Sequence, residues 1–108
     1  MYCEEIDLCL RIKRAGWEIW HVADAPVIHH GARSTSQFHL RMYVELHRSR
    51  YRFFAKHYSR VFCSTNRQIV RLGLARDVLQ TWWANQRGMT TETEYRERME
   101  AYRDVWKL

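Results

Sequence analysis

The chain has 108 residues, 46% of them apolar, and a formal net charge of +6 at pH 7. This length allows one domain with a modest core, and the apolar content, which includes five Trp and six Tyr, argues against a largely disordered chain. No apolar run approaches the roughly 20 residues of a membrane-spanning helix.

The positive charge is concentrated in the middle of the chain. Residues 38–76 hold nine basic residues and one acidic residue, whereas residues 1–37 and 77–108 each hold one more acidic than basic residue. Such a segment indicates an anionic partner, which can be a nucleic acid, phospholipid head groups or a diphosphate. The three cysteines are odd in number and lack CxxC spacing, which indicates reduced thiols of a cytoplasmic protein.

The first predicted element is a helix over residues 3–15, which Gly16 ends. Three carboxylates, Glu4, Glu5 and Asp7, stand at its start. Ionised carboxylates are favoured there because they face unpaired amide donors and the positive end of the helix dipole. They either cap and solubilise the helix start or hold a catalytic carboxylate at the edge of a cleft, and their spacing alone leaves both interpretations open.

Two short extended segments follow. Residues 17–22 are aromatic and β-branched, and residues 27–30 repeat this pattern before Gly31, so each predicts a strand. Two short strands rarely form a stable sheet alone, which indicates the end of a larger α/β sheet. Neighbours in a strand point to opposite faces, so His29 and His30 cannot both serve one pocket. One of them is a candidate metal ligand, or both are packed or solvated histidines.

The remainder of the sequence predicts helices. One covers residues 38–59, a second covers residues 63–86, and the capping-box pattern Thr91-x-x-Glu94 begins a third. The last helix carries an apolar stripe of Tyr95, Met99, Tyr102 and Trp106. The predicted fold class is therefore mostly α with a short two-strand β element.

A row of cations marks the first of these helices. Arg48, Arg52 and Lys56 share one helix face because they are four residues apart. Such a row can bind an anionic ligand such as a phosphate, or lie on an anionic membrane surface. A solvated helix face above packed aromatic residues and a nucleic-acid-binding surface are the alternatives.

The order and spacing of several short motifs resemble the C-terminal part of family-2 glycosyltransferases, in the bacterial rhamnosyltransferase-like branch that builds cell-surface polysaccharides. The resemblance covers the first 37 residues closely, and Lys56-His57-Tyr58 fits the same branch loosely. The matching motifs are Tyr2-x-Glu4-Glu5-x-Asp7-Leu8-Cys9-x-Arg11, Gly16-Trp17, Ala25-x-Val27-Ile28-His29-His30-Gly31 and Ser34-Thr35.

The resemblance implies a GT-A fold, in which residues 1–37 form the end of the catalytic domain and residues 38–108 form a C-terminal helical region. The nucleotide-binding half of that fold carries an Asp-x-Asp motif, and the 108 residues contain none. The resemblance thus implies an excised C-terminal fragment or a truncated gene. We expect the isolated chain to be inactive, to bind nucleotide sugar weakly if at all, and to bind no metal.

The resemblance also assigns roles to individual residues. Glu5 corresponds to the base that deprotonates the acceptor hydroxyl, with Glu4 as its catalytic neighbour, although the family usually has Asp at the position of Glu5. His29 corresponds to the histidine that helps to hold the divalent metal or the donor diphosphate. The residues expected to give structural support are Asp7, Arg11 and His30.

The implied function is the transfer of a sugar such as rhamnose from a nucleotide-sugar donor to a cell-surface glycan or a lipid-linked acceptor. Inverting transfer assisted by Mg²⁺ or Mn²⁺ is expected, at the inner face of the bacterial plasma membrane, with peripheral membrane contact. Apolar surface left uncovered on residues 17–22 and on the first helix should make the chain a homo-oligomer. The alternative is a small basic helical module that binds nucleic acid or a protein partner, although no nucleic-acid-binding motif accompanies the charge.

Overall fold

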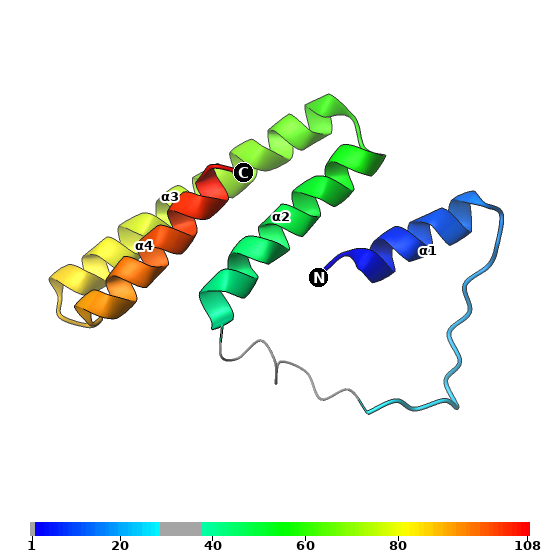
Figure 1. Ribbon diagram of the computed structural model, residues 1–108, viewed down its shortest axis with the longest axis horizontal. Helices are drawn as coiled ribbons and strands as arrows, with labels where there is room; N and C mark the ends of the chain where they lie inside the picture. Colours follow the sequence, from blue (N-terminus) through cyan, green and yellow to red (C-terminus); the bar gives the residue numbers. More distant parts are fainter. Residues whose placement is uncertain (1, 29–37) are drawn as a thin grey trace.

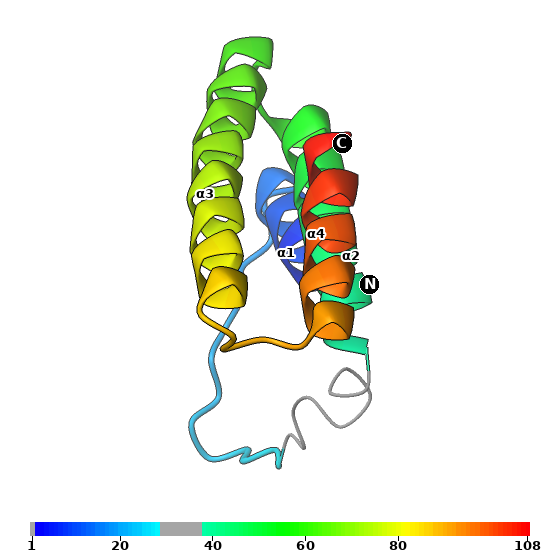
Figure 2. The same cartoon turned by 90° about the vertical axis from the view of Figure 1, so that its left-hand side faces the viewer.

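A computed structural model describes residues 2–28 and 38–108, and these residues form four helices and no strand (Figure 1). The helices are α1 (Glu4–Arg14), α2 (His39–His57), α3 (Arg60–Gln86) and α4 (Glu92–Trp106). The mostly helical fold predicted from the sequence is confirmed. Helices α2, α3 and α4 run up, down and up as one bundle, and α1 lies beside α2, across it from α3 and α4 (Figures 1 and 2).

Two local signals divide the bundle into its three helices. The Ser59 hydroxyl accepts a hydrogen bond from the Phe62 amide at 3.2 Å, so α3 begins directly after the short turn that follows α2. Gly88, with φ 68°, follows the end of α3 in a conformation that favours glycine. The predicted capping box is present, because Thr91 and Glu94 exchange side-chain and backbone hydrogen bonds at the start of α4.

The core of the bundle is small and lies where the three helices meet. Its buried apolar side chains come from α2, α3 and α4. They are Val44, Leu74, Ala101 and Val105. The last helix therefore packs on its own chain, a point that the sequence left open.

The side chains that α4 buries differ from its predicted stripe. Ala101 and Val105 are 5% and 1% exposed, whereas Trp106 is 49% exposed. Small side chains let α4 approach its neighbours closely, and the bulkier residues of the stripe then lie at the edge of the contact. Tyr102 belongs to the predicted stripe but is half-buried against the core. Its hydroxyl lies 3.3 Å from the Thr81 hydroxyl of α3.

The predicted β element is not formed by the residues that the structure describes. Residues 17–28 are exposed and carry no ladder of backbone hydrogen bonds, so the strand predicted at residues 17–22 is wrong for this chain. A strand needs a neighbouring strand to pair its amides and carbonyls, and residues 2–28 and 38–108 supply none. The second predicted strand reaches His29 and His30, which lie outside the described residues.

Candidate functional site

A pocket of about 420 Å³ opens between the start of α1 and the C-terminal half of α2. Carboxylates come to it from α1, and a hydroxyl and two cations come from α2. Its lining residues are Tyr2, Cys3, Glu4, Asp7, Ser49, Arg52, Phe53 and Lys56. Two predicted features that lie far apart in the sequence, the acidic start of the first helix and the basic row, therefore meet in one place.

Asp7 is the centre of the contact between the two helices. Its Oδ1 accepts hydrogen bonds from His57 Nε2 at 2.6 Å and from Lys56 Nζ at 2.7 Å, and its Oδ2 accepts one from Arg11 Nε at 2.9 Å. These donors, His57 first and then Lys56 and Arg11, hold the pKa of the Asp7 carboxyl well below its usual range. Asp7 is therefore ionised at neutral pH and is unsuited to take a proton from a substrate.

The proton on His57 can be assigned from its two partners. The Arg14 guanidinium lies 2.8 Å from His57 Nδ1, and a guanidinium only donates, so Nδ1 accepts. The proton of the neutral ring must then sit on Nε2, which donates it to Asp7. The His57 side chain is only 3% exposed, so this ring fixes α1 against α2 from within the contact.

Of the residues that form these contacts, Asp7, Arg11 and Lys56 had been predicted from the sequence as supporting or anion-binding residues. No such role had been predicted for Arg14 and His57. The signal that could have found His57 is the motif Lys56-His57-Tyr58, which fits the resembled branch loosely. Arg14 had no signal beyond its place in a basic last turn, where cations suit the negative helix end.

The acidic pair lies in the first turn of α1. Glu4 and Glu5 are both exposed, and Glu4 lines the pocket while Glu5 is not among its lining residues. Cys3 precedes the helix with φ 66° and gives no side-chain cap. The first-turn amides therefore receive no side-chain acceptor from Cys3, and both carboxylates sit at the positive end of the helix dipole.

The three cations of the predicted row have different surroundings. Arg48 pairs with Glu45 and lines another pocket, which faces the acidic side of α4. Lys56 pairs with Asp7. Arg52 lines the α1–α2 pocket and is the one cation of the three without an ion-pair partner among the described residues. The structure thus brings Arg52 and Lys56 together at the pocket and places Arg48 elsewhere.

The metal ion implied by the resemblance has no ligand set in residues 2–28 and 38–108. No three His, Cys, Asp or Glu side chains in these ranges are arranged to hold one. His29, the predicted ligand, and His30, the predicted supporting residue, lie outside the described residues. No step of the proposed reaction is therefore assigned to a metal ion. No described helix is long and apolar enough to cross a membrane.

The chain is similar to two proteins of Mycobacterium tuberculosis, from the strains CDC 1551 / Oshkosh and ATCC 25618 / H37Rv. Each is an N-acetylglucosaminyl-diphospho-decaprenol L-rhamnosyltransferase, and each is 39% identical to the chain over 59 residues. The similar region makes up 55% of the chain, and the chain spans 19% of each relative's length. No family model matches the chain. No solved structure matches it either. The partial similarity supports a glycosyltransferase and nothing finer.

Proposed function

We propose that this chain is the acceptor-side part of a family-2 glycosyltransferase with a GT-A catalytic domain. The observation that carries the proposal is the similarity to the two rhamnosyltransferases over more than half of the chain. The proposed reaction moves rhamnose, or a related sugar, from a nucleotide donor to a lipid-linked acceptor of the kind named for those relatives. Such an acceptor would place the reaction at a membrane surface.

The proposed chemistry is an inverting displacement. An acceptor hydroxyl oxygen forms a bond to the anomeric carbon while the bond from that carbon to the donor diphosphate breaks. The leaving nucleoside diphosphate takes the electron pair, and the hydroxyl proton passes to a carboxylate on the acceptor side. We assign this base role to Glu5, following the resemblance, with Glu4 as its neighbour at the pocket.

The surroundings of the three carboxylates support this division of roles. Asp7 already accepts hydrogen bonds from His57, Lys56 and Arg11, and its low pKa makes it a poor base. Glu5 is exposed at the helix start, which leaves its carboxylate accessible to an incoming hydroxyl. Asp7 would then position α1 rather than take part in the reaction.

The cations at the pocket suit an acceptor that carries a diphosphate. We propose that Arg52 binds a phosphate oxygen of that acceptor, since a guanidinium matches phosphate geometry and this one has no carboxylate partner among the described residues. The alternative, a basic module for nucleic acid, has less support. Two of the three cations in the predicted row, Arg48 and Lys56, are already paired with carboxylates.

The test is a transfer assay on the full-length protein. It would be incubated with radiolabelled nucleotide-activated rhamnose and a synthetic N-acetylglucosaminyl-diphospho-polyprenol, and label would be counted in the lipid phase. We expect labelled lipid that requires both substrates. No transfer from any nucleotide sugar tested, together with salt-dependent binding to DNA, would support the binding module instead.

A further inference from the structure

The outward side of α3 exposes several large apolar side chains, with polar residues such as Thr65 and Gln68 between them. Four of its side chains recur on one side of the helix and are more than half exposed: Val61 (76%), Leu72 (73%), Leu79 (59%) and Trp83 (55%). Ile69 and Trp82 flank them. We call these six residues the outer face of α3. The opposite side of the same helix carries Val70 and Leu74, which pack in the core.

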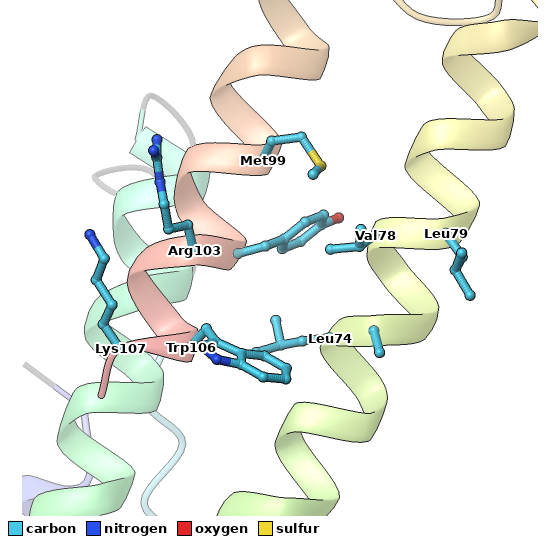
Figure 3. Close-up of a pocket in the computed structure, with 9 residues that line it drawn as sticks. Leu74, Val78, Leu79, Met99, Arg103, Trp106 and Lys107 are labelled. Atoms are coloured by element: carbon cyan, nitrogen blue, oxygen red, sulfur yellow. The ribbon is translucent and has the colours of Figure 1, made fainter.

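An apolar groove continues the outer face toward α4. It has a volume of about 620 Å³, and Leu79 belongs to both surfaces. Figure 3 shows Met99 and Trp106 of α4 directed toward α3, which lines the groove with Leu74 and Val78. Arg103 and Lys107 extend from the side of α4 that faces away from α3 (Figure 3). The groove lining contains no acidic residue.

Arginines border this apolar surface. Helix α3 contains four arginines and one acidic residue, Asp77; one of the four, Arg67, lies over the Tyr51 ring of α2 and does not border this surface. The Arg71 guanidinium lies 5.2 Å from the centre of the Trp106 ring, and the Arg87 guanidinium lies 5.6 Å from that of Trp83. Three acidic residues of α4 line a different pocket with Arg41 and Arg48 of α2. They are Glu97, Glu100 and Asp104.

We propose that the outer face of α3 and the adjoining groove dock this chain on an anionic lipid bilayer. Helices that lie in a membrane interface combine exposed Trp and aliphatic side chains with flanking Arg or Lys, which is the composition of this surface. Lipid phosphates would contact the arginines while the apolar side chains enter the head-group boundary. This assigns membrane contact to α3, and not to the row Arg48, Arg52 and Lys56.

Charge favours a bilayer over a second copy of the chain. Two copies that met through this face would bring the arginines of both α3 helices together, with one acidic residue in each helix to offset them. The hydrogen bonds and ion pairs that join α1 to the described bundle reach α2, and the carboxylate pocket lies between these two helices (Figure 1). Docking through α3 would therefore leave the pocket uncovered.

The inference rests on the proposed function only through the membrane location of the acceptor, and its test uses neither donor nor acceptor. Co-sedimentation would be measured with vesicles of phosphatidylcholine alone and with added phosphatidylglycerol. We expect binding to the anionic vesicles, weakened but not abolished when salt rises from about 0.1 M to about 1 M, because charge is screened while apolar insertion persists. Equal binding to neutral vesicles, or none to either kind, would overturn the proposal.

Paired variants locate the contact. Leu72→Glu/Trp83→Glu places two acids on the outer face of α3, and Val27→Glu/Ile28→Glu makes the same change at two exposed apolar residues of the α1–α2 connection. The first variant should lose about tenfold or more in vesicle binding, and the second should stay within about twofold of the unchanged chain. Circular dichroism would confirm that both remain helical. Equal losses would place the contact elsewhere.

Tryptophan emission supplies a readout that needs no change of charge. Anionic vesicles should shift the emission to the blue, and Trp82→Phe/Trp83→Phe should remove most of this shift while Trp17→Phe/Trp20→Phe keeps it. If the blue shift were lost with Trp17→Phe/Trp20→Phe and kept with Trp82→Phe/Trp83→Phe, the proposal would be contradicted. A dimer in sedimentation that Leu72→Glu/Trp83→Glu dissociates, without vesicle binding by the unchanged chain, would instead identify a second copy as the partner.

Discussion

Asp7 shows how one side chain can hold a helix that has little packing of its own. Helix α1 buries no residue, so its position depends on the polar contacts that Asp7 and Arg14 make with α2. These contacts join residues about fifty positions apart. A single carboxylate with two donors from α2, Lys56 and His57, therefore takes the place of an apolar interface here.

The first prediction follows from this anchor. Asp7→Asn removes the charge but keeps the shape, so α1 should detach from α2, and its amides should exchange hydrogen faster while those of α3 and α4 stay unchanged. Glu4→Gln is the matched control, because it makes the same change at an exposed residue of the same helix. Equal exchange in the two variants would contradict the anchoring role.

The pH dependence of this anchor has a definite sign. The pKa of Asp7 in the folded chain lies below its usual value of 3.8, so the folded state binds fewer protons in that range. Its stabilising contribution is fully present above pH 3.8 and is lost as the pH falls further toward the folded pKa. The protection of the α1 amides, relative to exchange in an unstructured peptide at the same pH, should fall below this pH in the unchanged chain, and Asp7→Asn should remove that pH dependence.

A second titrating residue lies in the bundle. His47 is 9% exposed, contacts the Tyr43 ring at 4.8 Å between ring centres, and leaves Nδ1 without a hydrogen-bond partner among the described residues. Burial, with a contribution from Arg50, lowers the pKa of His47 below its usual value of 6.5. The unfolded chain then takes up the proton more readily, so stability should fall as the pH drops below about 6.5.

His47→Phe should flatten this part of the stability profile, because the replacement keeps an aromatic ring and removes the titrating group. The measurement is urea unfolding between pH 5 and 8. His39→Phe, at an exposed position of the same helix, should leave the slope unchanged. A slope that both variants remove, or that neither removes, would show that His47 does not carry it.

Helix α3 has two apolar sides, one packed in the core and the other exposed. Leu74 is 2% exposed and packs in the core, whereas Leu72 is 73% exposed, two residues away on the same helix. Leu74→Ala should lower the free energy of unfolding by about 2–5 kcal/mol. Leu72→Ala should change it by no more than about 0.5 kcal/mol. Urea unfolding of the pair measures both, and equal losses would contradict the packing described for α3.

Sequence patterns predicted the helices because their signals are local. The capping box at Thr91 and the glycine that ends the first helix, Gly16 with φ 85°, are short-range features, and both were found as expected. The predicted boundary between the second and third helices was less accurate. The chain turns at residues 58–59, and Ser59 begins the third helix earlier than its apolar spacing indicated.

The features that the sequence could not predict depend on distant partners. Residues 17–22 have strand composition, yet a strand forms only beside another strand, and none lies in the described part of the chain. The contacts of Asp7 with Lys56 and His57 join α1 to α2. A short sequence motif does not predict a contact between side chains about fifty residues apart. The roles assigned to Glu5 and Glu4 came from the resemblance and stay predictions.

The described residues, 2–28 and 38–108, form a three-helix bundle and a first helix that is held mainly by polar contacts. The helices α2, α3 and α4 share the core, and residues 15–28 are exposed throughout. Chymotrypsin should therefore cut first at Trp17 or Trp20 and leave a protected fragment that contains all three bundle helices. Mass spectrometry of a timed digest identifies the fragment. First cuts within α3, despite its exposed aromatic residues, would show that the bundle is less stable than its packing indicates.

The role proposed for Glu5 is that of the acceptor-side base of a sugar transfer. The most direct test is Glu5→Gln in the full-length protein, with turnover measured by sugar transfer and donor affinity measured by calorimetry. Glu18→Gln, at an exposed carboxylate away from the pocket, is the control. We predict that Glu5→Gln lowers turnover by about 10²–10⁴-fold and leaves donor affinity nearly unchanged, because a general base acts in the transition state. Unchanged turnover, or an equal loss of turnover and donor affinity, would contradict the claim.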